Sequence, residues 1–250
     1  MAEITNTDVI NAWSRASQEI VANFGDEGDF TRRNLLNPII FGLVGDVSGK
    51  TILDAGCGQG YLSRLLAKKG AAVTGIEPAE PWYTYAVQRE QAERLGIRYV
   101  QEDLSVWAAV PNTFDYVIAN MVFMDIPDFL LALRSCIATL KREGGLIFSL
   151  LHPCFEESGS AWKEKGFVEV RDYFQERMVQ QTYAHFIHRP LSTYINSVVQ
   201  EGCTLQKVIE PQLDEAIARQ YQAERYCHVP GYLVISATKS SYKPERLRKK

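Results

Sequence analysis

The chain has 250 residues, of which 46% are hydrophobic and 23% charged, a composition typical of a folded globular protein. Its 27 basic and 30 acidic residues give a formal charge of −3. That balance argues against a general nucleic-acid or anionic-membrane binder, because such proteins carry a basic field. No apolar stretch approaches the roughly 20 residues that span a bilayer, and the first residues do not resemble a secretory signal. The five cysteines are irregularly spaced, so we expect reduced thiols in a cytoplasmic protein and no metal site.

The hydrophobic pattern predicts terminal helices around a regular alternation of strands and helices. Residues 6–23 and 33–43 carry apolar side chains at helical spacing. From residue 50 onward the predicted strands lie at 51–55, 72–76, 98–101, 116–119 and 146–151, and the predicted helices at 61–69, 82–95 and 129–140. Strands that alternate with helices in this way predict a parallel sheet with helices on both faces.

After residue 153 this alternation stops. An aromatic-rich segment at 168–189 looks extended, and a helix is predicted at 191–199. Two further strands are predicted at 205–209 and 232–238, and the charged tail 241–250 is expected to be disordered.

A glycine-rich turn follows the first predicted strand, in the residues DAGCGQG at 54–60. Glycines let the backbone approach a ligand closely, and the start of the next helix offers free N–H groups. The dinucleotide fingerprint G-x-G-x-x-G/A needs a small residue at position 61, where this chain has Tyr61. The turn therefore indicates a nucleotide-like ligand but disfavours tight packing on a pyrophosphate.

Two acidic residues at strand ends narrow the ligand further. Glu77 ends the second strand, where a carboxylate can accept hydrogen bonds from both hydroxyls of an unphosphorylated ribose. Asp103 follows the third strand and can accept a hydrogen bond from an exocyclic amine. Together with the glycine turn, they describe a ligand with adenine, a bare ribose and no phosphate.

Four segments in order, TILDAGCGQGYLSRLLAKKGAAVTGIEP, IRYVQEDL, FDYVIANMVFMDIPD and LKREGGLIFSLLHPCF, resemble class I S-adenosylmethionine-dependent methyltransferases. The resemblance implies an α/β, Rossmann-like, seven-stranded sheet with an antiparallel last strand and helices on both faces. It divides the chain into an N-terminal helical lid (1–46), a cofactor-binding core (47–153), a substrate-covering insertion (154–203), a segment that completes the sheet (204–240) and the tail.

The resemblance also implies a role for individual residues toward S-adenosylmethionine. Gly56, Gly58 and Gly60 would pack against its methionyl and ribose portions, and Asp54 would support the amino-acid end. Glu77, beside Pro78, would hold the ribose. Asp103 would contact the adenine amine and Leu104 the adenine face, while Asn120 would meet the methionine ammonium through its backbone carbonyl. From the residues alone, Arg32 or Arg33 could pair with the methionine carboxylate, and we assign Arg33; a solvated helix start is the alternative.

The flanking segments resemble bacterial small-molecule methyltransferases of secondary metabolism. The residues NMVF at 120–123 depart from the Asn/Asp-Pro-Pro-aromatic motif of nucleic-acid adenine methyltransferases. We therefore expect a small organic methyl acceptor, modified at O, N or C, and a monomer or homodimer that binds neither nucleic acid nor membrane.

His152 follows the fifth strand and is our first candidate for a general base, with His185 and His188 as further candidates. The alternative for His152 is a structural role in the Pro153 turn. His185 and His188 would face opposite sides of a strand, which argues against a metal pair. The predicted acceptor-binding residues are Trp13, Phe123, Tyr183 and Phe186. For Trp13 the alternative is a buried position on the face of the first helix, and for Tyr183 and Phe186 it is the half-buried packing that is usual for aromatic residues in strands.

Two other functions stay open at this point. The chain could hold the cofactor without turnover, or it could methylate RNA or protein. Detection of methyl transfer would exclude the first, and a closed, aromatic-lined pocket would argue against the second.

Overall fold

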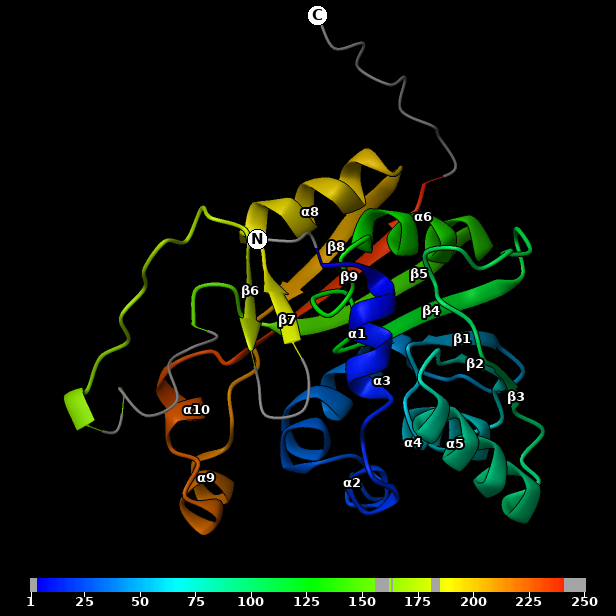
Figure 1. Cartoon of the computed structure of the whole chain (residues 1–250), viewed down its shortest axis with the longest axis horizontal. Coiled ribbons are helices and arrows are strands. Elements are labelled where there is room, and N and C mark those ends of the chain that lie inside the picture. Colours follow the sequence, from blue (N-terminus) through cyan, green and yellow to red (C-terminus); the bar gives the residue numbers. More distant parts are fainter. Residues whose placement is uncertain (1–3, 156–161, 163, 181–184, 241–250) are drawn as a thin grey trace, which may run out of the picture.

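A seven-stranded sheet crosses the centre of the molecule in the computed structural model, which describes residues 4–155, 162, 164–180 and 185–240 (Figure 1). Its strands are β1 (Thr51–Ala55), β2 (Ala72–Ile76), β3 (Arg98–Val100), β4 (Phe114–Asn120), β5 (Leu140–Leu151), β8 (Cys203–Ile209) and β9 (Tyr232–Lys239). The order across the sheet is β3-β2-β1-β4-β5-β9-β8. The first five strands are parallel, and β9 runs antiparallel to both β5 and β8. The predicted fold is confirmed.

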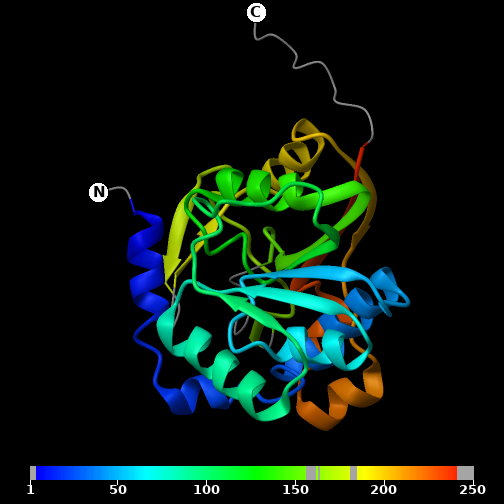
Figure 2. The ribbon, with the colours of Figure 1, turned by 90° about the vertical axis from the view of Figure 1, so that its right-hand side faces the viewer.

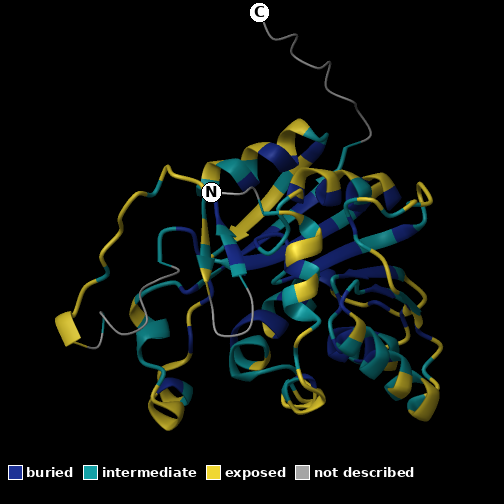
Figure 3. Ribbon diagram, in the orientation of Figure 1, coloured by how far each residue is buried: buried dark blue, intermediate teal, exposed yellow. Residues whose placement is uncertain are grey.

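Helices cover both faces of this sheet (Figures 1 and 2). One face carries α3 (Asn37–Val44), α4 (Tyr61–Lys68) and α5 (Glu80–Glu93), and the other carries α6 (Phe129–Thr139) and α8 (Leu191–Gln200). Val117 and Ile118 are neighbours in β4 and both are fully buried, but they belong to different core clusters. Successive side chains of a strand point to opposite faces of the sheet, so a strand that is buried on both faces contributes side chains to two hydrophobic cores. Figure 3 shows the resulting buried interior of the sheet.

The N-terminal region forms two helices where the sequence predicted one over residues 6–23. These are α1 (Asn6–Trp13) and α2 (Gln18–Ala22), followed by a π-helical turn at Arg32–Leu36. The break arises because the Ser17 side chain accepts a hydrogen bond from the N–H of Ile20 and so starts a new helix. Figure 2 shows α1 standing along one side of the molecule, beside α5.

The region after residue 153 adds small elements around the sheet. A two-stranded hairpin of β6 (Arg177–Gln180) and β7 (His185–His188) accounts for part of the extended segment. Two short helices, α9 (Glu215–Tyr221) and α10 (Arg225–His228), were not predicted; each is too short to show a clear helical period. The predicted tail and Tyr183 lie outside the described residues. Among the helices that the structure describes, none is long and apolar enough to span a membrane.

Candidate active site

A cavity opens at the carboxyl edge of the parallel strands, where ligands of open α/β sheets bind. It encloses about 930 Å³ free of protein atoms, part of which is open to solvent, within the usual size of a small-molecule site. The turns after β1, β2, β3 and β4 contribute one wall, and α1 with the segment before α3 contributes the other. The predicted residues that line it are Trp13, Gly56, Gly58, Glu77, Pro78, Asp103, Leu104 and Asn120.

The three glycines of the turn all have positive φ, but they face different surroundings. A Cβ at Gly56 would lie 2.6 Å from the Val122 side chain, and one at Gly60 would collide with the Tyr99 hydroxyl. At Gly58 the nearest atom would be 3.7 Å away, on Trp82. Gly58 therefore presents bare backbone to the cavity, where a ligand can approach it. Gly60, which was also predicted to touch the ligand, is instead packed behind the turn.

Glu77 is placed to hold a ligand with two hydroxyl groups. Its Oε2 accepts a hydrogen bond from the Gly58 N–H at 3.0 Å, and its Oε1 accepts one from the Ala79 N–H at 2.8 Å. Each carboxylate oxygen has a further lone pair, and the side chain lines the cavity. Burial raises the pKa of Glu77 to about 7, so a ligand that donates hydrogen bonds would favour the ionised form.

Asp103 is joined to the first helix through Asn6, a residue that the sequence did not single out. The Asn6 side-chain amide donates to Asp103 Oδ2 at 3.0 Å and to the Ser105 hydroxyl at 2.7 Å. Its carbonyl oxygen accepts from the Asp128 N–H at 3.0 Å. Asn6 therefore fastens α1 across the ends of β3 and β4, above the cavity.

Asn120 ends β4 with its side chain already bonded inside the protein. Its amide nitrogen donates to the Tyr61 hydroxyl at 2.7 Å, and its carbonyl oxygen accepts from the Ser149 hydroxyl at 2.5 Å. The next residue, Met121, has a positive φ of 64°. Because the side chain is occupied in this way, its backbone carbonyl is the group of Asn120 that is left to meet a cofactor.

The remaining predicted cofactor residues lie off the cavity. Asp54 is buried behind the glycine turn, where its carboxylate accepts from the Ser63 hydroxyl at 2.6 Å. Arg33 is not among the lining residues, whereas Arg32 is. Arg32 pairs with Asp29 and lies over the Phe24 ring, with its guanidinium carbon 5.1 Å from the ring centroid. Arg32 is therefore the better placed partner for a ligand carboxylate.

Residues 53–148 match the family model of the methyltransferase domain. They form a methyltransferase domain, and the chain shares its fold with S-adenosylmethionine-dependent methyltransferases of known structure. The residues that line the cavity fit S-adenosylmethionine, the cofactor that the sequence resemblance implies. The open backbone of Gly58, the carboxylates of Glu77 and Asp103 and the cation of Arg32 face one cavity, and they match its ribose, adenine amine and methionine carboxylate.

Curated relatives match about half of this chain, and solved structures match most of it. A ubiquinone biosynthesis O-methyltransferase of Coxiella burnetii is 31% identical over 126 residues, which are 49% of this chain and 54% of the relative. The enzyme of the same name from Klebsiella pneumoniae is 34% identical over 144 residues, 54% of this chain and 57% of the relative. The chain thus spans about half the length of the curated relatives it matches.

Two solved structures are similar over most of their length. A candidate S-adenosylmethionine-dependent methyltransferase of Listeria monocytogenes has a TM-score of 0.71 and 26% identity, and the match covers 82% of this chain and 96% of that one. A methyltransferase of Mesorhizobium loti has a TM-score of 0.75 and 23% identity, covering 86% and 100% of the two chains. The second likeness shows the fold alone. A [4+2]-cyclase also shares the fold, with a TM-score of 0.58 and 17% identity, so the fold by itself does not fix the reaction.

His152 does not line the cavity of the methyltransferase domain. Its Nε2 lies 2.8 Å from Glu210 Oε1, and its Nδ1 accepts from the Cys154 N–H at 3.2 Å. Both ring nitrogens are therefore engaged, and burial lowers the pKa of His152. The geometry favours the alternative of a residue that shapes the Pro153 turn, and it gives no support to His152 as a base.

The other predicted acceptor-side residues are mostly placed elsewhere. Phe123 packs on Phe148 in the core, and Phe186 is 2% exposed in the same cluster. His185 and His188 lie on β7 and do not line the cavity; His188 Nε2 contacts the Tyr173 carbonyl at 2.8 Å. Trp13 does line it, and its backbone carbonyl accepts from the Trp82 indole at 3.1 Å.

Asp125 is the cavity residue whose chemistry the sequence reasoning missed. Its side chain lines the cavity, and its carboxylate makes no hydrogen bond or ion pair to the part of the chain that the structure describes. Burial raises the pKa of Asp125 well above its ordinary value, with Arg32 opposing the shift and Glu77 adding to it. Its place in the loop that follows β4 was the available signal in the sequence. Among the described residues no group of three or more histidines, cysteines or acids could hold a metal ion.

Proposed function

We propose that the protein transfers the methyl group of S-adenosylmethionine to a hydroxyl oxygen of a small organic molecule. The observation that carries this proposal is Asp125, an unpartnered carboxylate in the cofactor cavity between apolar walls. Those walls include Val9 and Ile10 of α1 and Val122 and Ile126 of the loop after β4. Similarity to O-methyltransferases of ubiquinone biosynthesis supports oxygen as the acceptor atom.

Some of the cavity residues would bind the cofactor, and one would activate the acceptor hydroxyl. Glu77 would accept hydrogen bonds from the ribose hydroxyls, Asp103 would accept one from the adenine amine, and Arg32 would bind the methionine carboxylate. The bound cofactor supplies a methyl group on a sulfonium, which is already a good leaving group. The chain therefore mainly has to align the acceptor and exclude water. Asp125 would take the hydroxyl proton as the acceptor oxygen attacks.

Several finer predictions come from the sequence alone. A bacterial natural product as acceptor, a cytoplasmic location, a monomer or homodimer, and the division into lid, core and insertion remain predictions. The chain carries a net charge of −3. Apolar and aromatic residues of α1 and of the loop after α2 line the cavity. Both features favour a small acceptor over RNA.

A labelling experiment tests the proposal. The protein is incubated with S-adenosylmethionine that carries tritium on its methyl group and with a set of small phenols and alcohols, and separately with RNA and with casein. We expect S-adenosylhomocysteine and a labelled methyl ether with at least one small hydroxyl compound. Label in RNA or casein alone would contradict the proposal, and no label in any acceptor would favour a cofactor-binding protein without turnover.

A further inference from the structure

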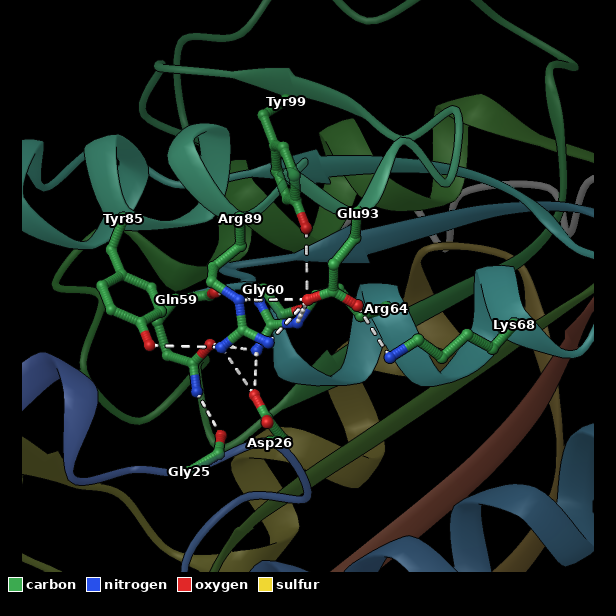
Figure 4. Close-up of polar contacts among 10 residues, drawn as sticks. All are labelled: Gly25, Asp26, Gln59, Gly60, Arg64, Lys68, Tyr85, Arg89, Glu93 and Tyr99. Atoms are coloured by element: carbon green, nitrogen blue, oxygen red, sulfur yellow. Dashed lines mark hydrogen bonds and ion pairs between the residues drawn. The ribbon is translucent and has the colours of Figure 1, made fainter. Parts of the chain in front are cut away.

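A fully buried guanidinium lies beneath the glycine turn. Arg64 of α4 is 1% exposed, and a charge this deep in a protein needs partners. Its two terminal nitrogens each donate a hydrogen bond of 2.7 Å to Gln59, one to the backbone carbonyl and one to the side-chain Oε1 (Figure 4). Arg64 thus fixes both the backbone and the side chain of one residue of the glycine turn.

Gln59 passes this connection on to the N-terminal region. Its side chain is 2% exposed and lines the cavity, and its Nε2 donates to the Gly25 carbonyl at 2.6 Å. The next residue, Asp26, lies 2.6 Å from Arg89 and 3.5 Å from Arg64, measured from its Oδ1 to a guanidinium nitrogen of each. Figure 4 shows these groups converging from α4, from α5 and from the loop after α2.

Glu93 of α5 is the second carboxylate that contacts Arg64 and Arg89. Its Oε1 lies 2.6 Å from Arg89 and 3.6 Å from the Nε of Arg64, and its Oε2 lies 2.7 Å from Lys68. We call Asp26, Gln59, Arg64, Arg89 and Glu93 the Arg64 cluster. The cluster holds two cationic and two anionic side chains, and the anions offset the cost of burying the guanidinium.

The Arg64 cluster holds residues 25–26, and residues that line the cavity lie before and after them in the chain. Phe24 and Arg32 flank residues 25–26 and both line the cavity, as does Trp13 of α1 farther back along the chain. Trp13 and Phe24 both pack edge-on against Trp82, with ring centroids 5.6 and 5.0 Å from its own. Residues 6–32, the lid segment, therefore cover the cofactor cavity and are fastened at residues 25–26.

We propose that Arg64 is a positioning residue that, through Gln59 and Asp26, couples the lid segment to the glycine turn so that both close on the cofactor together. The inference rests on the proposed function only in that the cavity holds S-adenosylmethionine. Without Arg64, the two Gln59 oxygens lose their donors and Asp26 keeps only Arg89. The turn and the lid segment then move independently, and ordering them costs part of the cofactor affinity.

The test combines calorimetric titration of S-adenosylhomocysteine with hydrogen exchange of the saturated protein, for Arg64→Met, Arg64→Lys and Asp26→Asn. Arg134→Met is the matched control, since Arg134 also pairs with a glutamate but lies on α6. We expect Arg64→Met to bind S-adenosylhomocysteine roughly 5–150-fold more weakly, the range of a coupling between two sites, and to exchange faster at residues 20–32 while β4 and β5 stay protected. Arg64→Lys should recover part of both losses, because its ammonium can still donate to one Gln59 oxygen.

Three outcomes separate this inference from its rivals. Wild-type affinity and wild-type exchange at residues 20–32 in a folded Arg64→Met protein would overturn it. Uniform loss of protection in β4 and β5 for both Arg64 variants would show a merely structural residue, and would also overturn it. If Arg64→Met does not fold, the exposed Asp26→Asn variant decides, and unchanged exchange at residues 20–32 there counts against the coupling. Failure of the wild-type protein to bind S-adenosylhomocysteine would instead defeat the proposed function.

Discussion

Asp125→Asn should lower kcat on a hydroxyl acceptor by about 10²–10⁴-fold, the usual contribution of a general base, and leave S-adenosylhomocysteine affinity nearly unchanged. The asparagine has the same shape, but its amide cannot take the proton of the acceptor. The measurement is kcat for both proteins on the best acceptor from the labelling experiment, with affinity from calorimetry. Asp128→Asn is the matched control, because Asp128 lies three residues on in the same loop and is exposed.

The pH profile gives this prediction a second readout. Asp125 acts when it is ionised, so kcat should rise as pH increases through its raised pKa, with Arg32 and Glu77 the charged groups that face it. Asp125→Asn should lose that rising limb. An asparagine variant with full kcat and an unchanged profile would remove Asp125 from the chemistry.

Glu77→Ala should weaken S-adenosylhomocysteine binding by roughly 10²–10⁴-fold, because two hydrogen bonds to a charged group contribute about 1.5–3 kcal/mol each. Calorimetry measures the affinity, and thermal unfolding shows whether the variant still folds after losing its bonds to the Gly58 and Ala79 N–H groups. Glu80→Ala is the control, since Glu80 is an exposed glutamate at the start of α5.

The same residue should make binding depend on pH. The pKa of Glu77 is raised to about 7, and hydrogen bonds from the ribose favour its ionised form. Binding near neutral pH should therefore release protons, and affinity should fall as pH drops below 7. Glu77→Ala should lose both effects. If its affinity matched that of the wild type at every pH, Glu77 would not contact the ligand.

The sequence predicted the sheet and the acids at its edge because both follow from local order along the chain. Strands that alternate with helices favour a parallel sheet, and the carboxyl ends of parallel strands lie at the same edge. Glu77 directly follows β2 and Asp103 lies in the turn after β3, so their place in the cavity needed no knowledge of side-chain packing. Asn6 and Arg64 reach the site through tertiary contacts, which no spacing in the sequence reveals.

The loop after β4 shows where sequence reasoning failed. Phe123 and Asp125 are two residues apart, and the sequence assigned the acceptor to the aromatic one. The chain turns at Met121, whose φ is positive, and this sends Phe123 onto Phe148 in the core while Asp125 lines the cavity. The directions of side chains in such a turn depend on backbone dihedrals that no residue type dictates.

Calorimetric titration of the protein with S-adenosylhomocysteine and, in parallel, with NAD tests the central claim most directly. Glycine turn, ribose carboxylate and amine acceptor together predict one S-adenosylhomocysteine bound per chain, with a Kd in the range of about 1 μM to 1 mM that is common for enzyme ligands, and no heat from NAD. Binding of NAD without binding of S-adenosylhomocysteine would contradict the account.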